Sequence, residues 1–166
     1  MTAETTFRPV PRAGEEAPDF TLPDDTGQPC TLSEQRGHWV LLFFYPKDDT
    51  SGCAREACAL RDADPEIKAL DARTWGVSIL GSGSKAAFKA KYGLPFTLLA
   101  DEEHRVAEAY GVWVQKTNYG KTYWGVQRAS FLVDPSGRLA HVWPKVDPDT
   151  HAAEVLAALK QVRRST

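Results

Sequence analysis

The chain has 166 residues, of which 42% are hydrophobic and 25% charged, so it is long enough for one compact domain with a sizeable core. Its formal net charge of −2 argues against a basic surface for nucleic acid or an anionic membrane. Residues 39–45 form the longest apolar run, which is too short to span a bilayer, and residues 1–14 lack the apolar segment of a signal peptide. Three cysteines are too few for a disulfide scaffold. We therefore expect a cytoplasmic protein with reduced thiols.

The first part of the chain predicts a tail, a hairpin and a buried strand. Residues 1–12 are polar with two prolines and predict a flexible tail, followed by a single domain over residues 13–166. Residues 19–33 predict two short strands around a turn. The continuous apolar run at 39–45 predicts a strand that is buried on both faces and ends at Pro46.

Helix signals follow this strand. A helix is expected to begin near Thr50 or Ser51 and to run towards Asp62. The sequence Asp-Ala-Asp-Pro then predicts a new helix capped by Asp64, because proline is favoured at the first helical position.

The second half of the chain alternates between strands and helices. We expect, in order, a buried strand (74–81), a helix (84–93), a short extended segment (95–101), a helix (102–111), a loop rich in Trp and Tyr (110–125), a two-stranded hairpin (128–143) and an amphipathic C-terminal helix (147–164). This order predicts an α/β protein with a mixed central sheet and flanking helices. It is the order of a thioredoxin-like fold with an extra N-terminal β-hairpin.

Two of the three cysteines lie close together, at Cys53 and Cys58. Cys53 falls in the first turn of the predicted helix, where unpaired N–H groups and the helix dipole favour a reactive thiolate. Gly52 lets a small reactant approach. The alternatives are a cysteine that acts only as a small hydrophobe and half of a zinc site, which would need two further ligands. The four scattered histidines do not have the spacing of zinc ligands, and a Cys-x-x-Cys motif is absent.

The spacing of the two cysteines restricts how they can pair. Five residues advance an ideal helix by roughly 7.5 Å and turn it by about 140°. The Cα atoms would then be farther apart than the roughly 7 Å that a disulfide allows. A bond between Cys53 and Cys58 needs local unwinding of the helix, so a transient disulfide fits better than a structural one.

The segment FFYPKDDTSGCAREACALRD, residues 43–62, resembles the signature of peroxiredoxins, specifically the bacterioferritin comigratory protein (PrxQ) branch. Its core is Pro-x-x-x-Thr-x-x-Cys, with Pro46, Thr50 and Cys53 at the matching positions. The resemblance extends from about Gly14 onward, because several longer blocks, such as QRASFLVDPSGRLAHVW, occur in the same order.

The resemblance implies a role for each matching residue. Cys53 would be the peroxidatic cysteine, whose thiolate attacks a peroxide oxygen and becomes sulfenic acid. Thr50 would hydrogen-bond the thiolate and the peroxide, and Pro46 would shield the pocket. Arg128 matches the active-site arginine, and Glu56 matches a glutamate that orients this arginine.

Cys58 matches the resolving cysteine of the intrahelical type, which would condense with the Cys53 sulfenic acid. The implied activity is reduction of hydrogen peroxide and organic hydroperoxides, with no cofactor and with thioredoxin or a similar dithiol protein as reductant. The chain would be a monomer or weak homodimer. Ser51 replaces the usual proline of this branch, and Cys30 is expected to be a bystander. The alternative to an enzyme is a peroxide sensor or chaperone-like redox switch without significant turnover.

Overall fold

The structure is a computed structural model that describes residues 9–164. Most of the predicted tail, residues 1–8, lies outside the described residues, whereas Val10 packs half-buried against one side of the core. No helix among the described residues is long and apolar enough to cross a membrane.

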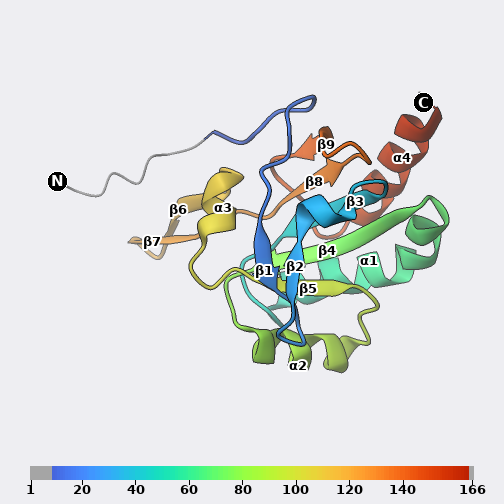
Figure 1. Cartoon of the computed structure of the whole chain (residues 1–166). Helices are drawn as coiled ribbons and strands as arrows, with labels where there is room; N and C mark the ends of the chain where they lie inside the picture. Colours follow the sequence, from blue (N-terminus) through green and yellow to red (C-terminus); the bar gives the residue numbers. More distant parts are fainter. Residues whose placement is uncertain (1–8, 165–166) are drawn as a thin grey trace.

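A five-stranded mixed sheet, in the order β5-β4-β3-β8-β9, forms the centre of the protein (Figure 1). Its strands are β3 (Trp39–Phe44), β4 (Ala72–Ser78), β5 (Thr97–Ala100), β8 (Ala129–Val133) and β9 (Leu139–Trp143). The strands β3, β4 and β5 are parallel, whereas β8 runs antiparallel to both β3 and β9. The predicted mixed sheet and the late hairpin are confirmed.

Strand β3 is buried on both faces, as its unbroken apolar sequence predicts. Leu41 and Phe43 share one core with the helices α1 (Ser51–Ala69), α2 (Ser82–Tyr92) and α4 (His151–Arg164). Leu42 and Phe44 point to the other core, which includes residues of the short helix α3 (Arg105–Ala109). Alternate side chains of one strand thus hold the two layers of the protein together.

The predicted N-terminal hairpin is also confirmed, with β1 (Thr21–Pro23) antiparallel to β2 (Pro29–Thr31). Gly27 has a φ of +88° in the connecting turn, a conformation that glycine adopts without strain. A 3₁₀ helix, η1 (Leu32–Gln35), leads from this hairpin into β3.

Helix α1 differs from the prediction because it continues through Pro65 without a new start. Asp64 does not cap a helix; its carboxylate is buried and lies 3.0 Å from the ammonium of Lys68. Apolar positions such as Leu60 and Ile67 continue the buried face on both sides of the proline. Pro65 itself is exposed, so its ring lies on the solvent side of the helix and does not disturb the buried face.

Helix α3 is shorter than the predicted 102–111. The two carboxylate oxygens of Asp101 accept hydrogen bonds from the backbone N–H groups of Val106 and Ala107, at 3.2 and 2.8 Å. His104 has a left-handed backbone with a φ of +50°. The helix therefore begins only after His104 and is capped from Asp101.

The prediction of a loop at residues 110–125 is wrong. The structure has a two-stranded hairpin here, β6 (Trp113–Asn118) and β7 (Lys121–Val126), paired from Asn118 opposite Lys121. Both residues of the turn, Tyr119 and Gly120, have positive φ, which matches the twist of a tight hairpin.

Candidate active site

Cys53 is the third residue of α1 and directly follows the loop that leaves the end of β3. Only 1% of its surface is exposed, and its side chain belongs to the same core as Tyr45 and Ala57. The helix begins at Ser51, within the predicted start, and Thr50 is the N-cap residue. Cys53 therefore lies where free N–H groups and the helix dipole favour an anionic sulfur.

Arg128 lies against this cysteine. One guanidinium nitrogen, Nη1, is 3.5 Å from the Cys53 sulfur and donates a hydrogen bond of 2.8 Å to Oε1 of Glu56. The sheet explains the approach, because Phe44 at the end of β3 pairs with Ala129 at the start of β8. The structure thus brings together three residues that the sequence proposed for the site.

Glu56 is a buried carboxylate on the same face of α1 as Cys53. Burial raises the pKa of Glu56 to about 7, against the opposing effect of its hydrogen bond and charge interaction with Arg128. Its second oxygen, Oε2, is buried and has no hydrogen-bond partner within residues 9–164. Burial by itself lowers the pKa of the Arg128 guanidinium. The hydrogen bond to Glu56 and the charge interaction with Cys53 outweigh burial, so the pKa of Arg128 is raised.

Gly52 faces the same guanidinium. A Cβ atom at this position would lie 3.0 Å from Nη2 of Arg128, closer than ordinary van der Waals contact. The missing side chain therefore makes room for the arginine, in addition to the reactant approach that the sequence suggested.

Thr50 and Pro46 belong to the segment that leads into the first turn of α1, where Cys53 lies. The Thr50 hydroxyl donates to the carbonyl of Lys47 at 3.3 Å and makes no side-chain cap to the helix. It is exposed, and its oxygen retains acceptor capacity. Pro46 lines an open groove together with Arg128.

The groove contains two lysines that sequence reasoning missed, Lys116 and Lys145. The Lys116 ammonium donates to the carbonyl of Val126 at 2.6 Å. Burial lowers the pKa of Lys116, and the positive charge of Arg128 acts in the same direction. The lining of the groove thus combines Arg128 with two lysines and with one carboxylate, that of Asp147.

The three cysteines are free thiols. Cys58 is half-buried further along α1, which is continuous from Cys53 past Cys58 and holds the two apart. Cys30 lies in β2, where burial and the carboxylate of Asp24 raise the pKa of its thiol. Cys30 is thus placed in a different element from the other two cysteines.

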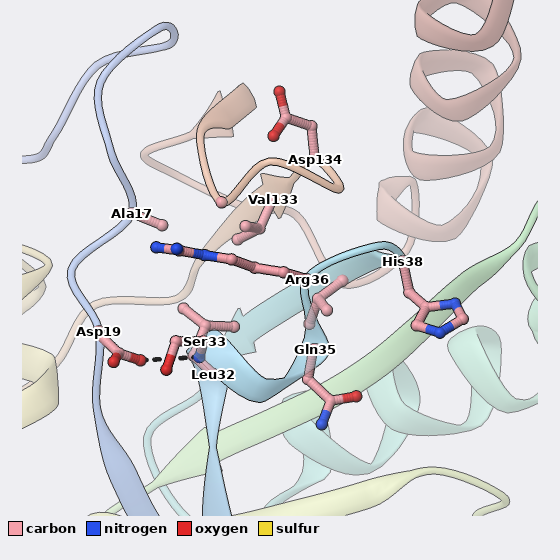
Figure 2. Close-up of a pocket in the computed structure, with 11 residues that line it drawn as sticks. Ala17, Asp19, Leu32, Ser33, Gln35, Arg36, His38, Val133 and Asp134 are labelled. Carbon is pink, nitrogen blue, oxygen red and sulfur yellow. Dashed lines mark hydrogen bonds between the residues drawn. The ribbon is translucent and has the colours of Figure 1, made fainter.

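A further pocket lies between the N-terminal segment, η1 and the β8–β9 turn (Figure 2). Its hydrogen bond joins the backbone N–H of Ser33 to the carboxylate of Asp19 at 2.9 Å. His38 and Val40 line it from the start of β3, whereas Cys53 follows the end of that strand. The residues that line this pocket include no cysteine, so it is separate from the candidate active site.

Comparisons with known proteins agree with this geometry. Residues 13–142 match the model of the AhpC/TSA family. The chain is 46% identical over 149 residues to a protein named Peroxiredoxin Bcp from Bacillus subtilis, covering 90% of this chain and 95% of that protein.

Two solved structures are also similar. A cysteine-to-serine variant of PrxQ from Xylella fastidiosa has a TM-score of 0.88 at 30% identity, covering 94% of this chain and 99% of that one. The bacterioferritin comigratory protein of Xanthomonas campestris, described in a study of its alkyl peroxide reduction activity, has a TM-score of 0.84 at 36% identity, covering 90% and 98%. These likenesses confirm the expected thioredoxin-like fold.

Proposed function

The chain belongs to the AhpC/TSA family, in the Bcp/PrxQ branch of the peroxiredoxins, and from this we propose that it is a thiol-dependent peroxidase that reduces hydrogen peroxide and organic hydroperoxides through Cys53. The observation that carries the proposal is the contact of 3.5 Å between the Cys53 sulfur and the Arg128 guanidinium at the start of a helix.

In the first step the Cys53 thiolate attacks the outer peroxide oxygen, forms an S–O bond and breaks the O–O bond. The products are Cys53 sulfenic acid and an alkoxide or hydroxide, which takes up a proton and leaves as alcohol or water. Arg128 stabilises both the thiolate and the charge that develops on the leaving oxygen. Glu56 holds Arg128 in place through the hydrogen bond of 2.8 Å.

Thr50 and Pro46 complete the proposed pocket. The Thr50 side chain does not accept a capping hydrogen bond from the N–H groups of α1, so its oxygen can accept a hydrogen bond from the peroxide. Pro46 lies beside Arg128 at the edge of the groove, where it limits the access of water to the reacting sulfur.

In the second step the Cys58 thiol displaces hydroxide from the Cys53 sulfenic acid, which yields an intrahelical disulfide and one water molecule. This step requires the first turns of α1 to unwind. Thioredoxin or a similar cytoplasmic dithiol protein then reduces the disulfide and is itself oxidised to a disulfide. We propose that the protein works as a monomer or weak homodimer.

A coupled assay tests the proposal against the alternative of a peroxide sensor. Reduced protein is mixed with thioredoxin, thioredoxin reductase, NADPH and hydrogen peroxide or cumene hydroperoxide, and NADPH loss is followed. Consumption of many equivalents per chain supports a peroxidase. Consumption that stops after one equivalent favours a redox switch.

A further inference from the structure

The loop between β3 and α1, residues 45–50, is held against α2 by a buried carboxylate. The Asp48 side chain is only 2% exposed. It accepts hydrogen bonds from the hydroxyls of Tyr45 at 2.5 Å and Ser84 at 2.7 Å, and the ammonium of Lys85 lies 3.3 Å away. Ser84 and Lys85 both belong to α2, so this helix supplies most of the partners of Asp48.

Lys85 is fully buried, which is rare for a lysine. Its ammonium also donates to the Ser78 hydroxyl at 2.7 Å and lies 5.5 Å from the centre of the Tyr45 ring. Removing either partner of a buried ion pair leaves the other charge without compensation, at a large cost. Asp48 therefore cannot leave this position while Lys85 stays buried and charged.

A second set of contacts joins α2 to both ends of residues 50–60, which we call the redox-active segment. Before the segment, the Asp49 carboxylate accepts from the Tyr92 hydroxyl at 2.6 Å and from Lys91 at 2.7 Å. After it, Arg61 donates to the backbone carbonyl of Tyr92 at 2.8 Å. The residues between these two points, 50–60, include both Cys53 and Cys58.

We propose that α2 restrains the redox-active segment, and we call this restraint the clamp. Lys85 and Tyr92 are its positioning residues, because they hold the chain on either side of the reacting cysteines. They fix the ends of residues 50–60, so that α1 stays wound around Cys53 and opens only within this range when Cys58 attacks. The inference rests on the proposed function. It adds that contacts outside the site set the rate of disulfide closure.

The clamp predicts the direction of change in two variants. Closure of the Cys53–Cys58 disulfide proceeds from molecules in which residues 50–60 are unwound. The rate of closure therefore scales with the fraction of molecules in that unwound state. Tyr92→Phe removes one hydroxyl donor to a carboxylate but keeps the ring, and we expect closure to accelerate about threefold. Lys85→Met leaves Asp48 buried without its cation, and we expect an acceleration of about tenfold or more. Neither change accelerates the oxidation of Cys53 by peroxide.

The experiment uses the reduced full chain and one equivalent of hydrogen peroxide. Quenched-flow samples are alkylated and analysed by mass spectrometry, which gives the rates of sulfenic acid formation and of Cys53–Cys58 closure separately. The matched control is Lys89→Met, because Lys89 lies on the same helix but pairs with Asp25 of the N-terminal hairpin turn, at 3.3 Å. We expect closure in this control to keep its original rate, whatever its thermal stability.

Faster disulfide closure in Tyr92→Phe, without faster oxidation of Cys53, supports the clamp. If Lys85→Met fails to fold, Tyr92→Phe alone decides the test. Closure at an unchanged or lower rate in Tyr92→Phe overturns the clamp, as does equal acceleration in Lys89→Met. If the unaltered protein forms no Cys53–Cys58 disulfide at all, the proposed resolving step falls, and the clamp falls with it.

Discussion

Arg128 and Cys53 are 75 positions apart in the chain, yet a guanidinium nitrogen of Arg128 lies 3.5 Å from the sulfur of Cys53. Two strands create this contact. Cys53 follows the end of β3, Arg128 directly precedes β8, and the two strands pair with Phe44 opposite Ala129. The antiparallel pairing of β8 with β3, the outermost of the three parallel strands, therefore brings the two residues together.

Replacing the arginine tests its electrostatic role. In Arg128→Met the thiolate loses the cation that contacts it at 3.5 Å, and we expect a lower thiolate fraction at neutral pH and oxidation by peroxide about a hundredfold slower. Thiolate absorbance near 240 nm and stopped-flow oxidation measure the two effects. Arg105→Met is the control, because the Arg105 side chain is 78% exposed and pairs with Glu103 on the surface. Unchanged thiolate fraction and rate in Arg128→Met would remove the arginine from the site.

A glycine substitution tests how closely the arginine must approach. In Gly52→Ala the new Cβ would meet Nη2 of Arg128 at 3.0 Å, so the guanidinium must shift by a few tenths of an ångström. We expect oxidation of Cys53 to slow by about threefold to tenfold while the fold is kept.

Gly83→Ala is a matched control for this change. Gly83 is the second residue of α2, as Gly52 is of α1, and a Cβ there would meet no atom within 4 Å. We expect this variant to react at the original rate and to be slightly more stable. If both alanine variants react like the unaltered protein, the tight approach of Arg128 does not matter for catalysis.

The sequence could predict the features whose causes are local. The apolar run of β3 and the strand-to-helix junction at Cys53 follow from patterns that neighbouring residues complete. The position of Arg128 depends on strand pairing across the chain, so only the family resemblance pointed to it.

The incorrect predictions, of a loop at 110–125 and of a new helix at Asp64, have physical causes as well. The β6–β7 hairpin is largely exposed, so its strands lack a clear apolar alternation, and the turn uses Tyr119 where Asn or Asp is common. Two turn residues flanked by Thr, Val, Tyr and Trp were the signal that could have revealed it. Pro65 suggested a helix boundary, but burial of residues on both sides outweighed the local cost.

The buried carboxylate of Glu56 predicts a dependence of stability on pH. Because burial raises the pKa of Glu56 to about 7, the folded chain holds this proton more tightly than the unfolded chain. The free energy of unfolding is therefore highest below the unfolded pKa of about 4.5 and falls as the pH rises through about 7, by about 3 kcal/mol for this group alone.

Glu56→Gln removes this titration, although it also weakens the contact with Arg128. The informative quantity is therefore the difference in unfolding free energy between the two proteins, measured with urea from pH 5 to pH 8 under reducing conditions. We expect this difference to shift in favour of the glutamine variant as the pH rises. A difference that is constant over this range would show that Glu56 does not take up a proton on folding.

The assignment of the nucleophile is tested by serine substitutions. Cys53→Ser should retain less than about 1% of the peroxidase activity, because an unactivated hydroxyl is a much weaker nucleophile than a thiolate. Cys30→Ser should keep nearly full activity, since Cys30 lies on the N-terminal hairpin. The coupled NADPH assay measures both. A large loss in Cys30→Ser would make this cysteine the resolving partner instead of Cys58.

The geometry of α1 governs the proposed resolving step. In the reduced protein α1 is wound from Ser51 through Cys58, so the disulfide cannot form without a conformational change. Oxidation of the unaltered protein should therefore lower hydrogen-exchange protection in the first part of α1 while the central strands β3 and β4 stay protected. Cys58→Ser should still consume one equivalent of peroxide.

Without a second thiol in reach, the Cys58→Ser variant should then stop as the Cys53 sulfenic acid and oxidise further to sulfinic acid in excess peroxide. Dimedone labelling detects the first product and intact mass the second, and turnover should return only when an external thiol replaces Cys58. Peptide mapping of the oxidised unaltered protein decides the pairing. A Cys30–Cys53 bridge, or a bond between two chains with Cys58 left free, would contradict the intrahelical mechanism and still leave Cys53 as the residue that reacts with peroxide.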